Sequence, residues 1–294
     1  MMRDLRGYGD QPPAVAWPGG ARVAVSFVLN FEEGAEFSIA DGDACNESIY
    51  EVIDQQDVLD PCIDSHFEYG TRVAYWRIVD LAEQYGIPLT VSACGQAVRR
   101  SPWLVQDAAR RGHEIAAHGF RWQTHAGMPI ETERRVIAMT VEAIRQATGR
   151  SPVGWHTRSV RTANTRVLLR EQGFLYDSDA YNDDTPYFVD VCGERHLVLP
   201  YAFDTNDMQF QNTNRFDTGE SFARYVCDGF DWLYREGQRF PRMLSVGLHL
   251  RMIGRPARMS ALERIFAHVA AQGGWVATRE QIARHWIASV PSAA

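Results

Sequence analysis

The sequence lacks the long apolar runs of a membrane protein. No run among its 294 residues approaches the length that crosses a bilayer, and no cationic start leads into an apolar signal core. An excess of basic residues is also missing, because 30 Lys and Arg stand against 37 Asp and Glu, a net charge of -7. Nucleic acids and anionic membranes both require a basic face, so neither is expected as a partner. We therefore expect a cytoplasmic protein that acts on a small molecule.

Several catalytic signatures are absent as well. The five cysteines are scattered and form no Cys-x-x-Cys pair, which is typical of reduced structural thiols. There is no Gly-x-Ser-x-Gly elbow and no Gly-rich phosphate loop. The first absence argues against a covalent intermediate, and the second argues against a nucleotide cofactor. If the protein is a hydrolase, direct attack by water is favoured.

What the sequence does contain is organised around an apolar run over residues 23–31, which leads directly into Glu32, Glu33 and Gly34. Its content of Val and Phe predicts a strand that is buried on both faces. Carboxylates at the end of such a strand are costly, because their charge is held near an apolar wall. They either lead into a solvated loop or belong to a functional site, and the rest of the chain favours the site.

Strand and helix patterns alternate along the rest of the chain. Strands are predicted at 88–94, 114–118, 152–156, 174–178, 196–200, 243–249 and 275–278, with helices at about 73–86, from Ser101 onward, and at 131–148, 163–172, 218–236, 258–272 and 279–287. This alternation predicts a parallel sheet, and the number of units favours a barrel.

The length of the chain suits one α/β barrel with extensions, so we expect a single catalytic domain over residues 1–294. Residues 1–20 are rich in Gly and Pro and should form an irregular arm. Residues 35–66 lack clear periodicity and should form a long loop or lid.

Polar side chains gather where the predicted strands end, which is where parallel barrels hold their active sites. They are Glu32, Glu33, His118, Arg121, Trp122, His156, Arg158, Arg161, Asp177, Asp179, Asp204, Asn206, Asp207, His249 and Arg251. A carboxylate facing an imidazole is the minimum apparatus for hydrolysis, because one group takes a proton from water and the other protonates the leaving nitrogen. Guanidinium groups bind the carboxylate or carbonyl oxygen of a small polar ligand.

Three of these stretches resemble the polysaccharide deacetylase family, whose strands end in Asp-Asp, in His-x-x-x-His and in a late Leu-His. The matching stretches are Asn30-Phe-Glu-Glu-Gly34, His118-Gly-Phe-Arg-Trp122 and Val246-Gly-Leu-His249. The chain is more similar still to the allantoinase branch, which looks alike from residues 4–9 through Phe67-Glu-Tyr-Gly70 to residues 282–286. Bacterial cyclic imide hydrolases look like members of that branch. The resemblance implies a distorted (β/α) barrel that hydrolyses a small cyclic amide.

The resemblance also implies residue roles. By position, Glu32 stands where the deacetylases have their catalytic base, Glu33 and His118 where they bind zinc, and His249 where they have the acid. For direct hydrolysis we leave the base open between Glu32 and Glu33, and we expect His118 to steady the oxyanion. The candidates for substrate binding are Glu68, Trp122, His156, Arg158, Arg161, Asp179 and Arg251.

The chain departs from the zinc deacetylases at Trp122, which occupies the position of their second zinc histidine. An indole nitrogen only donates and cannot bind a cation. No cofactor is therefore expected, as described for the allantoinase branch. A nonstandard zinc site of Glu33 and His118 with either His125 or His156 is the alternative. Because His156 also lies in a segment that differs from the allantoinases, a plain imide such as succinimide or maleimide is favoured over allantoin.

Two other functions remain open at this point. One is a zinc-dependent deacetylase of N-acetyl sugars, and the other is a barrel that binds a small ligand without catalysis. The resemblance further suggests a homo-oligomer such as a tetramer, with residues 1–20 assisting its assembly.

Overall fold

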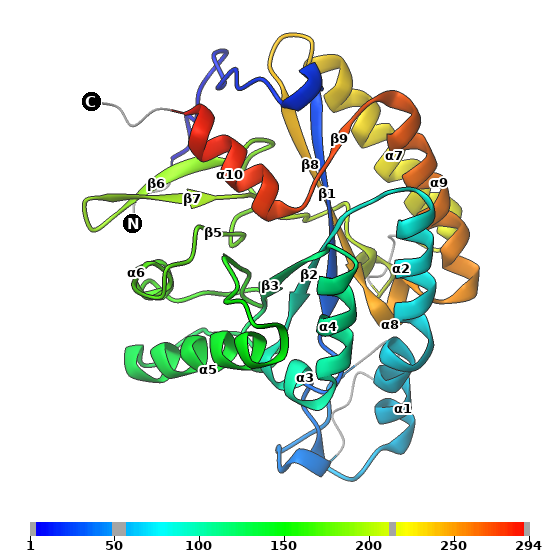
Figure 1. The fold of residues 1–294 in the computed structure, drawn as a ribbon. Coiled ribbons are helices and arrows are strands. Elements are labelled where there is room, and N and C mark those ends of the chain that lie inside the picture. The colour runs from blue at the N-terminus through cyan, green and yellow to red at the C-terminus, as the bar shows by residue number, and fades with distance from the viewer. Residues whose placement is uncertain (1–3, 49–56, 212–215, 291–294) are drawn as a thin grey trace.

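The computed structural model describes residues 4–48, 57–211 and 216–290, and its strands form one curled sheet (Figure 1). The strands are β1 (Val23–Phe31), β2 (Leu89–Ala93), β3 (Glu114–Ala117), β4 (Gly154–Trp155), β5 (Tyr176–Asp177), β6 (Tyr187–Val191), β7 (Glu194–Val198), β8 (Arg242–His249) and β9 (Trp275–Val276). Their order is β6-β7-β5-β4-β3-β2-β1-β8, and β9 also pairs with β1. All pairs are parallel except the β6–β7 hairpin. This half-barrel confirms the predicted distorted (β/α) barrel.

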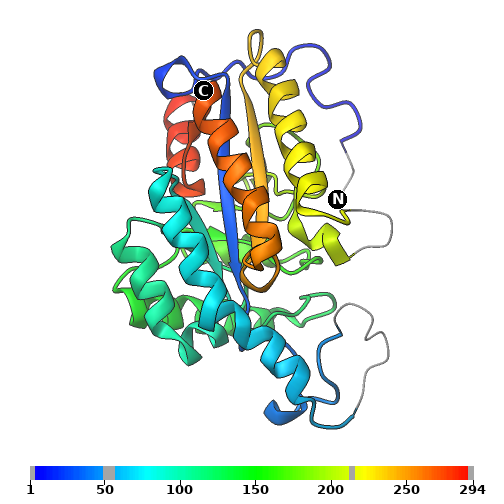
Figure 2. The ribbon, with the colours of Figure 1, turned by 90° about the vertical axis from the view of Figure 1, so that its right-hand side faces the viewer.

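Helices cover the outside of the sheet. They are α1 (Pro61–Tyr69), α2 (Tyr75–Gln84), α3 (Gly95–Arg100), α4 (Pro102–Arg110), α5 (Ile130–Thr148), α6 (Thr165–Glu171), α7 (Gly219–Glu236), α8 (Leu250–Ile253), α9 (Pro256–Gln272) and α10 (Arg279–Ser289). Figure 2 shows α2, α9 and α7 lying side by side across β1 and β8. Among the described residues, no helix combines the length and the apolar character that a bilayer span requires.

Strand β1 lies at the centre of the sheet and carries the site. All nine of its residues are buried, so the prediction of a strand covered on both faces is confirmed. Asn30 near its end pairs with Ser92 of β2 on one side and with His249 of β8 on the other. Because these strands are parallel and end level with one another, their carboxyl ends lie close together.

The prediction of a loop over residues 35–66 is wrong for its last part. Helix α1 begins at Pro61, and the Asp60 carboxylate caps it by accepting the backbone N–H groups of Cys62 and Ile63. An Asp before a Pro is a common helix start, because the Pro needs no hydrogen bond in the first turn. Residues 49–56 of the predicted loop lie outside the described part of the chain.

The β6–β7 hairpin is an element that our sequence predictions missed. Its turn contains Cys192 and Gly193, whose φ values are 56° and 82°. Two successive positive φ values are typical of a tight hairpin turn. The local sequence did hold a hairpin signal, because the β-favouring run Tyr187–Val191 leads to a glycine at the turn, Gly193.

The N-terminal arm is irregular, as predicted, apart from a short turn at Pro18–Gly20. Trp17 anchors it to the body of the molecule, because the residue is only 2% exposed and its ring centroid lies 5.7 Å from those of Trp275 and Trp286. The Trp17 indole N–H also donates to the Arg242 carbonyl at 2.8 Å. Residues 1–3 of the predicted arm lie outside the described part.

Candidate active site

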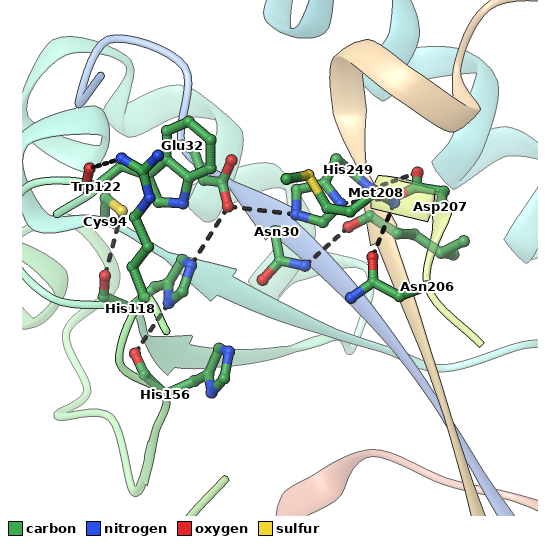
Figure 3. Close-up of polar contacts among 12 residues, drawn as sticks. Asn30, Glu32, Cys94, His118, Trp122, His156, Asn206, Asp207, Met208 and His249 are labelled. Carbon is green, nitrogen blue, oxygen red and sulfur yellow. Dashed lines mark hydrogen bonds and ion pairs between the residues drawn. The ribbon is translucent and has the colours of Figure 1, made fainter. Parts of the chain in front are cut away.

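A cavity of about 240 Å³ opens at the carboxyl ends of the strands (Figure 3). Glu32 follows β1, His118 follows β3, His156 follows β4, and His249 is the last residue of β8. All four line this cavity, together with Asn30, Trp122, Arg158, Ser159, Tyr181, Tyr201, Ala202, Phe203, Asn206, Met208 and Gln209. The structure thus brings together residues from four of the strand ends at which the sequence analysis found polar side chains.

Glu32 is the central charge of the cavity and is fully buried. Its Oε1 lies 3.3 Å from His118 Nε2 and 3.4 Å from His249 Nε2, and its Oε2 lies 2.8 Å from Arg251 Nη1. Burial alone would raise the pKa of Glu32, but His249, Arg251 and the hydrogen bond with His118 hold it well below its usual range. Glu32 is therefore a carboxylate at neutral pH.

His249 is held between two carboxylates. Its Nδ1 donates to Asp207 Oδ1 at 2.6 Å, and its backbone N–H donates to Asp207 Oδ2 at 2.8 Å. Burial lowers the pKa of His249, yet the charges of Glu32 and Asp207 outweigh it and raise the pKa to about 9. At neutral pH the ring is an imidazolium that can give up a proton. Asp207 was not among the catalytic or substrate-binding residues predicted from the sequence, although the sequence analysis named it among the polar residues at the strand ends.

The orientation of the His118 ring follows from its neighbours. Its Nδ1 lies 2.9 Å from the carbonyl oxygen of His156, which can only accept, so Nδ1 carries a hydrogen. On the other side of the ring, Nε2 faces Glu32 Oε1 at 3.3 Å. The His118 ring also stacks on the His156 ring, with centroids 5.0 Å apart and planes 6° apart. The hydrogen bond to the His156 carbonyl and the stacking on the His156 ring together fix the orientation of His118 in the wall of the cavity.

His156 and Arg158 form one wall together with Trp122. Burial lowers the pKa of His156, and its Nδ1 lies 3.2 Å from Asp179 Oδ1. The Arg158 guanidinium lies 3.6 Å above the centre of the Trp122 ring and donates to the Trp122 carbonyl at 2.7 Å. Both Nη atoms of Arg158 also donate to the Glu47 carboxylate. This wall therefore presents a cation that is held in place by its contacts.

Other predicted residues do not reach the cavity. Arg251 is fully buried beneath Glu32, with Phe67 and Trp122 rings 4.6 and 4.8 Å from its guanidinium carbon. Glu68 is exposed and forms an ion pair of 3.6 Å with Arg72. The remaining two lie elsewhere as well, since Arg161 donates to the Thr162 carbonyl and Asp179 accepts from the backbone and hydroxyl of Thr157.

Glu33 also does not line the cavity. Its carboxylate lies 3.4 Å from Arg251 Nη1 and accepts the backbone N–H groups of Glu32 and Arg251. Burial raises the pKa of Glu33. Of the two adjacent acids, only Glu32 lines the cavity.

The residues do not fit a zinc site. Glu33 faces Arg251, and His125 is buried elsewhere with its Nδ1 3.0 Å from Glu133 Oε1, so the alternative donor set does not converge. The indole of Trp122 packs against the guanidinium groups of Arg158 and Arg251. Within residues 4–48, 57–211 and 216–290, no three His, Cys, Asp or Glu side chains are grouped so that they would hold a metal ion.

Comparisons with known proteins identify the family. A family model described as polysaccharide deacetylase matches residues 55–175. A putative polysaccharide deacetylase of Schizosaccharomyces pombe (strain 972 / ATCC 24843) is 37% identical, and the alignment covers 98% of each chain.

Solved structures agree with this assignment. A probable polysaccharide deacetylase from Pseudomonas aeruginosa PAO1 is 44% identical, with a TM-score of 0.94 and 99% coverage of each chain. Puue allantoinase is 42% identical, with a TM-score of 0.93, and the match covers 99% of this chain and 98% of that one. The similarity extends over nearly the whole length, so this chain belongs to the polysaccharide deacetylase family.

Proposed function

We propose that this protein is a hydrolase that opens the ring of a small cyclic amide, either an allantoin-like ureide or an imide such as succinimide. The observation that carries the proposal is the Glu32 carboxylate 3.4 Å from the His249 imidazolium in a cavity of about 240 Å³. This volume is below the range of sites for drug-sized ligands and suits a single small ring. Similarity to Puue allantoinase over 99% of the chain supports the same substrate class.

In the proposed mechanism, Glu32 takes a proton from the attacking water and His249 gives one to the departing ring nitrogen. The low pKa of Glu32 depends on the positive charge of His249. When His249 gives up its proton that charge disappears, and Glu32 becomes a stronger base. The two proton transfers therefore assist each other, and no covalent intermediate is needed.

The developing oxyanion needs a stabilising partner in the cavity. Arg158 brings a fixed guanidinium group to the wall, and His118 lies beside Glu32. Fixed donors of this kind stabilise charge that appears in the transition state. An imide carbonyl is also activated by its neighbour, so it requires less polarisation than the carbonyl of a plain acetamide.

Glu32→Gln and Glu33→Gln form a matched pair of tests. We expect Glu32→Gln to lower kcat at least about 100-fold, because a general base typically contributes that much. Glu33→Gln should keep kcat within about tenfold, since its carboxylate lies outside the cavity. Ring opening of allantoin and succinimide would be followed for both variants. Near-native turnover in both would exclude the proposed base.

A chelator tests whether catalysis depends on a metal. Because the donors do not converge on a zinc site, we expect the protein treated with chelator to open its preferred ring as fast as before, within about twofold. Adding zinc back should not increase the rate. Comparing allantoin with succinimide in the same assay would show which ring is preferred. Loss of activity with chelator and recovery with zinc would contradict this part of the proposal.

A zinc-dependent N-acetyl-sugar deacetylase is the second candidate. It is favoured by the family model and by a peptidoglycan deacetylase from Helicobacter pylori (strain ATCC 700392 / 26695), which is 26% identical over 72% of this chain. Trp122 argues against it for the reason given above. Acetate release from chitooligosaccharide, abolished by a chelator, would establish this function in place of the first.

A further inference from the structure

One buried hydrogen-bond acceptor in the wall of the cavity has no partner. Asn30 lies two residues before Glu32 and is only 1% exposed. Its Nδ2 donates to the Leu248 carbonyl at 3.0 Å and to the Tyr201 hydroxyl oxygen at 2.8 Å (Figure 3 shows Asn30 beside Glu32 and His249). Its Oδ1 accepts no hydrogen bond from any residue that the structure describes. Buried polar groups are rarely left unpaired, so this oxygen requires an explanation.

The orientation of the Asn30 amide is settled by its neighbours. The backbone carbonyl of Leu248 can only accept a hydrogen bond, so the NH₂ group of Asn30 must face it. A flipped amide would place two acceptors against each other. The free acceptor of Asn30 is therefore its Oδ1, a buried oxygen on a side chain that lines the cavity.

Tyr201 supplies a free donor next to this acceptor. Its hydroxyl oxygen accepts from Asn30, so its own hydrogen remains to be donated, and no described residue accepts it. Burial raises the pKa of Tyr201, which keeps the phenol protonated. Tyr201 and Asn30 both line the cavity. The wall thus presents one acceptor and one donor side by side.

An adjacent acceptor and donor match one kind of amide. In a small ring the amide bond is forced to be cis, so its N–H and C=O point to the same side. Open-chain secondary amides, which include the N-acetyl group of sugars, strongly prefer the trans form, in which the two groups point apart. Only the cis form can contact both groups of the wall through one edge.

We infer that Asn30 and Tyr201 recognise the N–H and C=O edge of a cyclic amide, with Asn30 Oδ1 accepting from the ring N–H and the Tyr201 hydroxyl donating to the adjacent carbonyl. This inference rests on the proposed function, because it names the edge by which that substrate is held. It is compatible with protonation by His249. The N–H lies in the ring plane, whereas the lone pair that forms on the nitrogen as the C–N bond breaks points out of it.

The test compares binding of succinimide with binding of N-methylsuccinimide, which lacks the N–H. Dissociation constants would be measured by calorimetry on the full chain carrying Glu32→Gln, so that the ligand is not consumed. We expect succinimide to bind about 10- to 100-fold more tightly. Adding Asn30→Leu, a change that keeps the side-chain size, should reduce this preference at least about fivefold. If the preference is unchanged, it comes from shape alone and the inference is overturned.

Tyr201→Phe is the second variant and should give a different result. It keeps the ring but removes the donor, so we expect both ligands to bind about 5- to 20-fold more weakly with their ratio unchanged. Unchanged affinity for both would overturn the role of Tyr201. Circular dichroism would confirm that each variant is folded.

A third measurement does not depend on any variant. The cis lactam 2-pyrrolidinone should compete with succinimide for the site, whereas the trans amide N-methylacetamide should not at the same concentration. Equal competition by both would overturn the inference. Turnover is measured separately on the unsubstituted chain, so failure of the proposed function would appear as absent ring opening while the binding ratios still report on Asn30 and Tyr201.

Discussion

At the scale of single residues, Asp207 determines how the candidate acid behaves. It accepts hydrogen bonds from the His249 ring, the His249 backbone and the backbone of Ile253. Its charge is one of the two that raise the pKa of His249. Asp207 therefore both positions the imidazole and keeps it protonated.

Asp207→Asn should change the pH dependence of the reaction. Since the acid must be protonated, activity should fall as the pH rises through about 9, the pKa of His249. In the variant one neighbouring charge is lost, so the pKa of His249 falls and activity should decline at a lower pH. We also expect kcat to fall about 10- to 100-fold. The measurement is kcat/KM as a function of pH.

Asp204→Asn is the matched control for this prediction. Asp204 lies in the same segment, but its carboxylate is exposed and accepts from the Tyr225 hydroxyl at 2.8 Å. The dependence of kcat/KM on pH for the Asp204→Asn variant should match that of the unsubstituted protein. An alkaline limb that stays in place in Asp207→Asn would show that His249 is not the acid.

At the scale of elements, the π-helical segment Gly70–Ala74 joins α1 to α2 and packs against the Glu33 side chain. Gly70 allows a close approach there, because a Cβ at this position would lie 2.6 Å from the Glu33 Cδ and 2.7 Å from its Cγ. Insertions of this kind in helices are common near functional sites. The segment therefore positions the Glu33 carboxylate, which contacts Arg251 as the Glu32 carboxylate does.

Gly70→Ala should destabilise the protein by about 1–3 kcal/mol, the usual cost of overpacking a tight core. Gly229→Ala is the control, because Gly229 lies within α7 and a Cβ there meets nothing within 4 Å. The control should be stabilising by about 0.4–1 kcal/mol, since Ala restricts the unfolded chain. Urea unfolding of both variants would provide the comparison. Equal changes in the free energy of unfolding for the two variants would show that the close approach of Gly70 to Glu33 does not limit the side chain at position 70.

At the scale of the whole molecule, the N-terminal arm is packed into the structure. Its anchor, Trp17, contacts aromatic residues from β9 and α10, so the first and last segments of the described chain share one cluster. We propose that the chain unfolds as a single domain for this reason. The predicted oligomer stays a prediction, and light scattering of the purified protein would test it.

Trp17→Ala should lower the free energy of unfolding by about 3–5 kcal/mol, as expected when a buried Trp is removed. The whole protein should still unfold in one transition, at a lower urea concentration. Trp232→Ala is the control, since Trp232 is 58% exposed, and it should cost less than about 1 kcal/mol. A loss below about 1 kcal/mol for Trp17→Ala would show that the arm contributes little to the fold.

The sequence by itself determined the parallel strands, most of the helices and the strand ends that meet at the site. Apolar runs and helical periodicity are local properties, and parallel connections bring the carboxyl ends of strands to one edge. For that reason Glu32, His118, His156 and His249 could be predicted to lie together. Trp122 could likewise be recognised as a poor metal ligand from its chemistry alone.

Only the tertiary structure decided which of these groups act on one another. Glu33 meets Arg251 across 218 positions of sequence, and Asp207 meets His249 across 42. Such pairs depend on register and side-chain direction, which local patterns do not contain. The same applies to Glu68, Arg161 and Arg251, which stand near strand or helix ends in the sequence yet do not line the cavity. Local patterns place a residue at an edge of the fold, but packing between distant segments decides what its side chain faces.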